Sequence, residues 1–322
     1  MRNPWVEIVP LGGQEPQSDP LNSFRGLRTA ENSHRAFSRP QLHQLMSPIK
    51  KVSVLIPTYQ GMEFLDRLLS GLAAQDLKLQ WEVYVIDSSS SDGTWEFLGE
   101  WAERFPVPFR RERIHSVEFD HGDTRNLLAA RTDGELLVYL TQDAIPSDAS
   151  FLSKLVANFS DSTVAAVTCR NVPRPDAHLL TKLFSENDPG YKEGRREVRL
   201  EDVEGYEEMN AHERRLLYNF NDVAAAYRRS VWERHPFPRT PFGEDVLMAR
   251  ALLEAGFTVV YDDEATVEHS HDYSPEEHHA RGAVDARFNA EWLDRVCVST
   301  RSDARELMKR QLVTDVAAIT SA

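Results

Sequence analysis

The sequence predicts an α/β protein in which helices flank an open, mainly parallel β-sheet. Short apolar runs rich in β-branched residues alternate with longer segments whose apolar residues recur at helical spacing. This alternation is typical of strand–helix–strand units in a parallel sheet. The expected strands are residues 52–56, 81–86 and 136–140, and the expected helices are 64–72, 95–103 and 123–130. A later helix within 244–257, ended by Gly256, and an extended segment at 259–261 continue the pattern.

Length and charge limit the protein classes to which the chain can belong. Its 322 residues can bury a sizeable core without disulfide bonds, and 41% of them are hydrophobic, an ordinary globular value. Acidic residues outnumber basic residues by 51 to 37, which gives a formal net charge of -14. A surface with this charge repels nucleic-acid phosphates. We therefore expect a soluble protein with no nucleic-acid partner, although a local basic pocket could still hold one diphosphate.

Cysteine usage and the absence of long apolar runs favour the cytoplasm. Cys169 and Cys297 are far apart and match no metal-binding spacing, so a reducing compartment is the simpler interpretation and a structural disulfide the alternative. The sequence starts without a signal-peptide pattern, and no apolar run approaches the ~20 residues that span a bilayer. We expect a cytoplasmic protein that could associate peripherally with the inner face of the cell membrane.

The texture of the sequence divides the chain into three parts. Residues 1–48 carry glycine, proline and polar residues without a sustained period, which indicates an irregular N-terminal arm. Residues 49–300 form the expected main domain, and 301–322 a C-terminal helical tail. Within the domain, residues 176–215 have few apolar positions and resemble an exposed excursion from the sheet. This excursion could be a lid, an acceptor-binding segment or a passive surface loop.

The loops that follow the strands are where a ligand is expected. In open α/β sheets ligands bind beyond the carboxyl ends of the strands, so the loops after Ile56, Ile86 and Leu140 should converge on one crevice. The second loop begins with Asp87 and the third contains Asp143. Each carboxylate could simply cap a turn or helix. In a binding site, Asp87 could accept hydrogen bonds from a nucleoside, and Asp143 could hold a divalent cation against a diphosphate.

Three further motifs carry groups suited to catalysis. Residues 119–126 combine His121, Arg125 and a helix start, all of which can face an anion. Glu244 and Asp245 open a helix whose dipole should keep them ionised near neutral pH, as a general base requires. Residues 268–273 alternate side chains, so His269 and His271 share one face in an extended conformation and one of them could bind a metal. Capped helices and surface histidines are the structural alternatives.

The order of these motifs resembles that of the family-two inverting glycosyltransferases with the GT-A fold, in particular their rhamnosyltransferase-like branch. The resemblance covers roughly residues 52–273. The runs 54–61 and 85–94 are similar to the opening signature and the nucleotide-binding loop of the family. The Asp-x-Asp metal motif of the family falls on Thr141-Gln142-Asp143, so only its last carboxylate is present. The Gln-Asp-Ala form at 142–144 and the run 119–126 resemble rhamnosyltransferase-like members.

The resemblance implies a role for each of these residues. Asp245 would be the general base and Glu244 would orient the acceptor. A divalent cation, Mg²⁺ or Mn²⁺, would bind Asp143 with help from His269 or His271. The donor-binding residues would be Pro57, Thr58, Tyr59, Asp87, Ser89, His121, Arg125, Gln142 and Asp143.

The resemblance also implies a reaction, with alternatives that the sequence leaves open. One sugar, with dTDP-L-rhamnose as the first choice of donor, would be moved to a hydroxyl of a glycan or lipid-linked glycan. The chain has no Gln-x-x-Arg-Trp run of the processive synthases, which favours one sugar per acceptor. UDP- and GDP-sugars are alternative donors, and a non-catalytic sugar-nucleotide or glycan-binding protein is an alternative function. A nucleotidyltransferase ranks last, because residues 57–61 contain one glycine rather than a glycine-rich phosphate loop.

Overall fold

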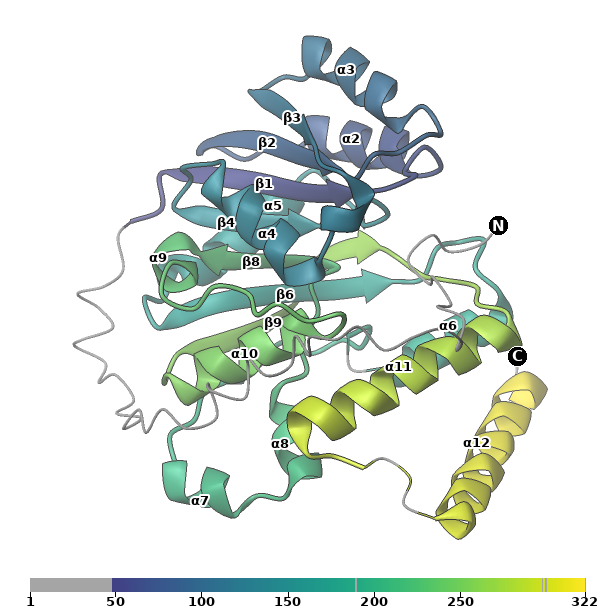
Figure 1. Ribbon diagram of the computed structural model, residues 1–322. Helices are drawn as coiled ribbons and strands as arrows, with labels where there is room; N and C mark the ends of the chain where they lie inside the picture. The colour runs from purple at the N-terminus through teal and green to yellow at the C-terminus, as the bar shows by residue number, and fades with distance from the viewer. Residues whose placement is uncertain (1–47, 189, 297, 299, 322) are drawn as a thin grey trace, which may run out of the picture.

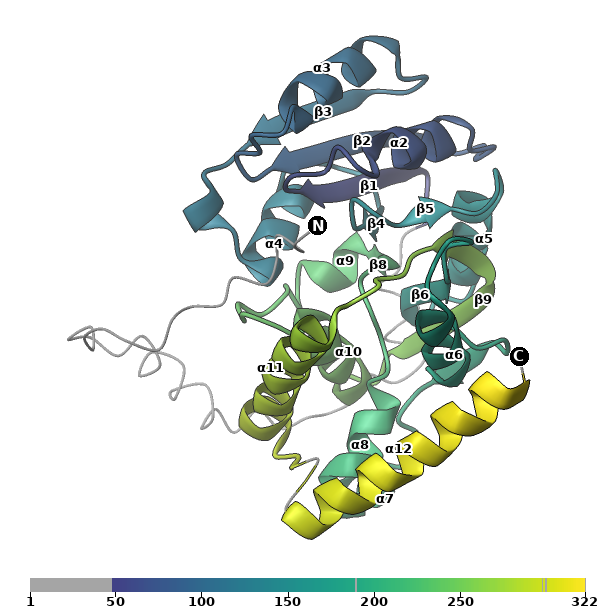
Figure 2. The same ribbon diagram turned by 90° about the vertical axis from the view of Figure 1, so that its right-hand side faces the viewer.

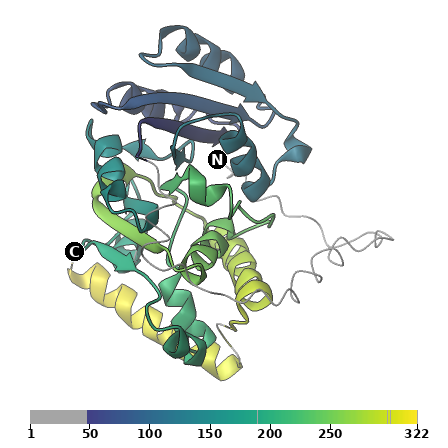
Figure 3. The same cartoon turned by 90° about the vertical axis from the view of Figure 1, so that its left-hand side faces the viewer.

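The computed structural model describes residues 48–188, 190–296, 298 and 300–321. Its centre is one twisted sheet with helices on both faces, as Figure 1 and the two side views in Figures 2 and 3 show. The expected α/β architecture is therefore confirmed. The expected N-terminal arm, apart from Pro48, and Cys297 lie outside the described residues.

Nine strands of the described residues form this sheet, in the order β3-β2-β1-β4-β8-β6-β9-β5, with β7 paired to β9. The strands β1, β2, β3 and β4 are parallel to one another, and β6 is parallel to β9. The strands β8, β5 and β7 pair antiparallel with their neighbours. Their bounds are β1 Lys51–Thr58, β2 Gln80–Asp87, β3 Phe109–Arg113, β4 Leu136–Leu140, β5 Ile145–Pro146, β6 Val164–Val172, β7 Arg196–Val198, β8 Ala224–Arg228 and β9 Thr258–Glu268.

The helices divide between the two faces of the sheet. Helices α2, α3 and α5 contribute their buried side chains to one hydrophobic core, while α4, α10 and α11 contribute to the other. Figure 1 shows α4, α10 and α11 on the same side of the sheet. The helices are α2 Leu65–Ala73, α3 Thr94–Arg104, α4 His121–Ala130, α5 Phe151–Ala157, α6 Leu179–Asn187, α7 Val203–Glu208, α8 Ala211–Leu217, α9 Arg229–Trp232, α10 Glu244–Glu254, α11 Pro275–Leu293 and α12 Arg301–Ser321, with 3-10 turns η3 Ser116–Glu118 and η4 Asn158–Ser160.

Buried apolar runs explain the central strands. Strand β4 is buried at every position, and β1 and β2 at every position after the first. Strands covered on both faces read as continuous apolar runs, which is why the sequence pattern located all three.

Residues 176–215, expected to be an exposed excursion from the sheet, contain regular elements that the sequence pattern did not locate. They form α6, β7, α7 and most of α8. The cap residues Asp202 and Asn210 accept hydrogen bonds from backbone N–H groups in the first turns of α7 and α8. These helices are short and polar, so their apolar spacing is too weak to appear in the sequence pattern. Among the described residues, no helix combines the length and apolar character that crossing a bilayer requires.

Candidate active site

The loops after β1, β2 and β4 meet at the carboxyl ends of these strands, as expected. Thr58 pairs with Asp87 at the end of the β1–β2 ladder. The backbone N–H of Ser88 donates to the carbonyl of Thr58 at 2.9 Å. The Thr58 hydroxyl in turn donates to the Gln142 side chain at 2.6 Å. Residues at or just after the ends of β1, β2 and β4 are thus joined by hydrogen bonds at one edge of the sheet.

Gln142 joins the loop after β4 to the loop after β1. Its Oε1 accepts from the Thr58 hydroxyl and, at 2.8 Å, from the N–H of Tyr59. Its Nε2 donates to the Tyr59 carbonyl at 3.0 Å. Gly61 leaves room for this arrangement, because a Cβ at this position would lie 2.6 Å from the Thr58 hydroxyl oxygen and 2.9 Å from Gln142 Oε1. Gln142, expected to contact the donor, therefore holds the loop that would contact it.

Asp87 is buried at the end of β2 and organises its own loop. Its carboxylate accepts from the backbone N–H of Ser90 at 3.2 Å and from Nε of Arg113 at 3.1 Å. Ser89 adopts a left-handed backbone, with φ 60°, and its hydroxyl donates to the Ile114 carbonyl at 2.7 Å. Pro57 and Thr58 lie on the adjacent strand β1 and are buried. The expected donor-binding residues of β1 and β2 therefore lie side by side at the carboxyl ends of the two strands.

Asp143, His269 and His271 form a cluster at the same edge of the sheet. Their ligand atoms all lie within 4.8 Å of one another. Nε2 of each histidine lies 3.5 Å from Oδ2 of Asp143. Asp143 lies three residues after β4, and His269 and His271 lie one and three residues after β9. Residues about 126 positions apart in sequence meet because both strands end at the same edge. The expectation that His269 and His271 share one face agrees with this geometry.

The protonation states in this cluster suit cation binding. Burial alone would raise the pKa of Asp143, but the adjacent imidazoles hold that pKa well below its usual range. Burial, assisted by the neighbouring His269, lowers the pKa of His271 to about 4. Near neutral pH the cluster therefore offers a carboxylate oxygen and, at His271, a neutral imidazole, which are donor types that Mn²⁺ and similar ions accept.

Arg174 lies beside this cluster and was not identified from the sequence. Its Nη2 donates to the backbone carbonyl of Asp143 at 3.2 Å and lies 3.8 Å from the Asp143 carboxylate. Nη1 donates to the carbonyl of Ser270, and the guanidinium lies 4.2 Å from the centre of the Phe64 ring. Arg174 comes two residues after β6, and only the pairing of β6 with β9 brings it to the site. No local motif marks it.

A second group of charged side chains surrounds Arg125 of α4. The buried Arg125 guanidinium lies 2.9 Å from Glu244 and 3.1 Å from Asp222. The Tyr227 hydroxyl donates to the other oxygen of Asp222 at 2.5 Å. His121 lies 3.8 Å from Glu244, but burial, with the nearby Arg125, lowers its pKa to about 4, so it is neutral near neutral pH. Arg125, expected to face an anionic donor, is directed at two carboxylates of the protein.

Asp245 stands next to this group and is held by backbone amides. The N–H of Asp222 donates to its Oδ2 at 3.3 Å, and its own neighbour Val246 donates to Oδ1 at 2.7 Å. The sequence predicts that the helix dipole keeps Asp245 ionised near neutral pH. In the structure, burial and then the adjacent charge of Glu244 raise its pKa to about 6. A carboxylate with this pKa is ionised at pH 7 and above and is a stronger base than an exposed aspartate.

Comparisons with known proteins agree with the fold. The sequence model of glycosyl transferase family 2 matches residues 53–234, more than half of the chain. The O-antigen chain rhamnosyltransferase RfbN of Salmonella typhimurium is 32% identical over 253 residues, which cover 76% of this chain and 75% of RfbN. WbaN of Salmonella anatum, also an O-antigen chain rhamnosyltransferase, is 32% identical over 222 residues, 66% of this chain and 65% of WbaN.

Solved structures similar to this chain have the GT-A fold. The mannosyltransferase PcManGT from Pyrobaculum calidifontis, in complex with GDP-Man and Mn²⁺, superposes with a TM-score of 0.56 at 19% identity, covering 88% of this chain and 81% of PcManGT. TarS 1-349 of S. aureus in complex with UDP has a TM-score of 0.52 at 18% identity, covering 79% of this chain and 68% of TarS 1-349. At these identities the likeness establishes the fold alone.

Proposed function

The chain belongs to glycosyl transferase family 2, and on that basis we propose that it transfers one sugar, with inversion, from a nucleoside-diphosphate sugar to a hydroxyl of a glycan or lipid-linked glycan. The observation that carries this proposal is that Asp143, His269 and His271 form a cluster at the edge of the sheet where β2 ends in Asp87. A nucleoside at Asp87 and a diphosphate at Asp143 would lie along one crevice. Two relatives named as O-antigen chain rhamnosyltransferases make dTDP-L-rhamnose the first donor to test.

The residues around Asp143 fit a divalent cation, Mg²⁺ or Mn²⁺. One carboxylate oxygen and two imidazole nitrogens lie close enough together to share an ion. PcManGT, which has the same fold, is described in complex with GDP-Man and Mn²⁺. When bound, such a cation would offset charge on a departing diphosphate. Arg174, beside Asp143, adds a fixed positive charge to the same place.

Asp245 is the group that we propose as general base. Its carboxylate would take the proton of the acceptor hydroxyl while that oxygen forms a bond to the anomeric carbon of the donor. The bond from the anomeric carbon to the diphosphate oxygen would break in the same step, and the nucleoside diphosphate would leave. Glu244, fixed by Arg125 at 2.9 Å, would orient the acceptor. The amides of Asp222 and Val246 keep the base in place without neutralising it.

The remaining donor contacts follow from the loops after β1 and β2. Tyr59 and Ser89 would border the nucleoside, in a loop shape that Gln142 and Asp87 maintain through their hydrogen bonds. His121, neutral near neutral pH, could donate or accept a hydrogen bond at the donor. A lipid-linked acceptor would require peripheral association of this cytoplasmic enzyme with the inner face of the membrane. We retain residues 49–300 as the catalytic domain in this proposal, with 1–48 as an arm and 301–322 as a tail.

Donor turnover tests the proposal directly. The purified chain would be incubated with dTDP-L-rhamnose, UDP-glucose, UDP-GlcNAc or GDP-mannose, each with Mn²⁺ or with EDTA, and release of the nucleoside diphosphate measured. We expect release from one donor, dependent on the cation. Thermal shift would report donor binding separately, because a ligand that binds only the folded state raises the melting temperature. If none of the four donors binds and none is turned over, the donor site is refuted.

Two aspartate variants test the base. Asp245→Asn should retain the donor-dependent thermal shift but lose sugar transfer, since an amide cannot accept the proton. Asp66→Asn is the matched control, because Asp66 also lies in the first turn of a helix but is exposed on α2. Normal transfer by Asp245→Asn would show that another group is the base.

A further inference from the structure

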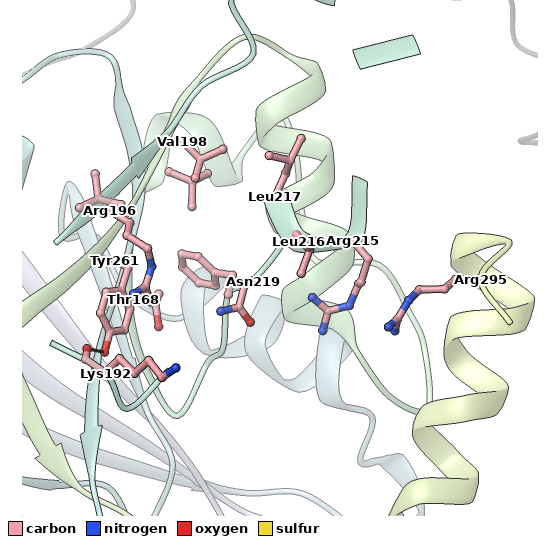
Figure 4. A pocket seen from close by; sticks show the side chains of 13 residues that line it. Thr168, Lys192, Arg196, Val198, Arg215, Leu216, Leu217, Asn219, Tyr261 and Arg295 are labelled. Carbon is pink, nitrogen blue, oxygen red and sulfur yellow. Dashed lines mark hydrogen bonds between the residues drawn. The ribbon is translucent and has the colours of Figure 1, made fainter. Parts of the chain in front are cut away.

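A cavity of about 360 Å³ lies between the strands at one end of the sheet and helix α8. Its lining comes from β6, Lys192 before β7, β7, α8, residues 219–220, β9 and Arg295 after α11. Figure 4 shows the side chains around it. None of the residues assigned above to the donor, the cation or the base belongs to this lining. Its size is that of a site for a small organic ligand.

The charged side chains of the lining are all cationic. Lys192, Arg196, Arg215 and Arg295 line the cavity, and no aspartate or glutamate is among its lining residues in the described part of the chain. In Figure 4 Lys192 and Arg215 point toward Asn219 from opposite sides, and Arg295 points toward Arg215. This gathering of positive charge stands in a chain with a formal net charge of -14. A ligand with more than one negative charge would offset it best.

Neighbouring groups orient two of these cations and hold the backbone of a third. The Arg196 guanidinium lies 3.8 Å from the centre of the Tyr261 ring. Arg295 donates to Asn289 at 2.9 Å and lies 3.2 Å from a nitrogen of His212. Tyr261 also donates its hydroxyl to the backbone carbonyl of Lys192 at 2.7 Å, which fixes the chain that carries this lysine. Guanidinium groups held in place in this way bind phosphate oxygens with little loss of entropy.

The rest of the lining is largely apolar. Seven of the lining residues are hydrophobic or aromatic: Val198, Leu216, Leu217, Phe220, Val259, Val260 and Tyr261. An apolar wall beside a cationic rim suits a ligand that joins a carbon skeleton to a phosphate. Inorganic phosphate alone would leave the apolar wall unused.

We propose that this cavity binds a phosphate or diphosphate group carried by the sugar acceptor, so that the acceptor is a glycosyl phosphate rather than a neutral glycan. The inference rests on the proposed function, because it assumes that Asp245 receives the acceptor hydroxyl. Phe220 lines the cavity and is two residues from Asp222, a separation of at most about 7 Å along the backbone. Asp222 donates its N–H to Asp245. A short acceptor could therefore contact both places.

The segment between the cavity and the base is fixed in position. Thr168, which lines the cavity, donates its hydroxyl to the carbonyl of Asn221 at 2.8 Å. The rings of Phe220 and Tyr227 lie 5.6 Å apart, and the Tyr227 hydroxyl donates to Asp222. A phosphate held at the cavity would therefore have a defined position relative to Asp245.

Pyrophosphate binding tests the cavity without any enzymatic turnover. Calorimetry in EDTA would compare the wild type with the double variant Lys192→Gln/Arg215→Gln. We expect pyrophosphate affinity to fall by about tenfold or more in that variant, because two charged contacts are lost. The matched control is Lys182→Gln/Arg214→Gln, which removes the same charges from residues of α6 and α8 that do not line the cavity. Equal affinity in all three proteins would refute the cavity as a phosphate site.

Matched acceptors test whether the phosphate belongs to the acceptor. Each candidate sugar would be supplied as its 1-phosphate and as its methyl glycoside, and KM compared for the wild type and both double variants. We expect a KM at least about tenfold lower for the phosphate, with this preference lost only in Lys192→Gln/Arg215→Gln. No preference in the wild type would refute the acceptor assignment even if pyrophosphate binds. Failure of the proposed function would appear separately, as an absence of donor turnover in every protein.

Discussion

Replacement of Arg125 by glutamine should destabilise the protein strongly and in a pH-dependent manner. Arg125 is 5% exposed, and its guanidinium lies within 3.1 Å of carboxylates from two other segments. Glutamine keeps some of the volume but removes the positive charge. Glu244 and Asp222 would then be buried without a cationic partner, and Asp245 lies beside them. Breaking a buried ion pair by removing one partner costs about 3–5 kcal/mol, so we expect a loss of this size at pH 8.

The pH dependence follows from the charges that Arg125 compensates. Burial raises the pKa of Asp222 to about 7 and that of Asp245 to about 6, and in both cases Arg125 opposes the rise. Without Arg125 both pKa values should rise further. A carboxylate whose pKa is higher in the folded than in the unfolded state costs stability when it is ionised, and this cost disappears as the pH falls through the folded-state pKa. The destabilisation by Arg125→Gln should therefore be largest at pH 8 and smaller at pH 5.5.

Urea unfolding at the two pH values measures this effect. The difference in the free energy of unfolding between wild type and variant would be obtained with the m-values checked for agreement. Arg131→Gln is the control, because Arg131 makes a two-contact pair with Glu112, at 2.8 and 2.9 Å, on the surface. It should change stability little. Adding Glu244→Gln to Arg125→Gln should restore part of the loss. An equal loss at pH 8 and pH 5.5, or a loss no larger than that of Arg131→Gln, would show that the group is not electrostatically coupled.

Three other predictions concern the base, the proposed cation site and the loop after β1. The kcat/KM of the wild type should fall about tenfold per pH unit below about pH 6, since Asp245 must be ionised and its pKa is raised to about 6; a profile flat to pH 4.5 would exclude it as base. Asp143→Asn should weaken Mn²⁺ binding, measured by calorimetry, by about a hundredfold or more. Even residues that only hydrogen-bond to metal ligands contribute about 10–100-fold to metal affinity. Unchanged affinity would place the ion elsewhere. Gly61→Ala should lower the free energy of unfolding in urea by about 1–3 kcal/mol, because the new Cβ would collide with Thr58 and Gln142. The control Gly282→Ala, in open space on α11, should raise it by up to about 1 kcal/mol. Similar values for the two variants would contradict the close approach at Gly61.

The sequence predicted those strands whose state depends on local composition. Strands β1, β2 and β4 are apolar runs that end in turn-forming residues. Strand β8 has the sequence AAAYR, and alanine is a poor strand former. Its extended state comes from antiparallel pairing with β4 and β6, where buried alanines admit close packing. Strand β3, with the sequence FRRER, lies at the sheet edge, where charged residues are common, and its pattern does not indicate burial.

The sequence predicted the site residues that belong to a recognisable motif, but not those that only the pairing of distant strands brings to the site. Asp87, Asp143 and Asp245 each follow or open an element that the sequence reveals. Arg174 and Asp222 lie in segments without a distinctive local pattern. Arg174 reaches the site because β6 pairs with β9, and Asp222 because β8 pairs with β4. Raised pKa values also escape sequence analysis, because they depend on burial and on neighbours distant in the chain. The pKa of Asp245, about 6, still leaves it ionised at pH 7, but the rise from its ordinary value could not be foreseen for this reason.

The side chain of Gln142 has a consequence for how strongly the cation and the donor affect the binding of each other. It accepts hydrogen bonds through one atom and donates through the other, which an amide can do and a carboxylate cannot. The loop after β1 therefore excludes a second carboxylate next to Asp143. With Arg174 and the neutral imidazole of His271 beside it, the carboxylate of Asp143 leaves the cluster with almost no net negative charge before a cation arrives. The proposed divalent ion would leave an excess of positive charge that a donor diphosphate can cancel, so each ligand should strengthen the binding of the other by the same factor.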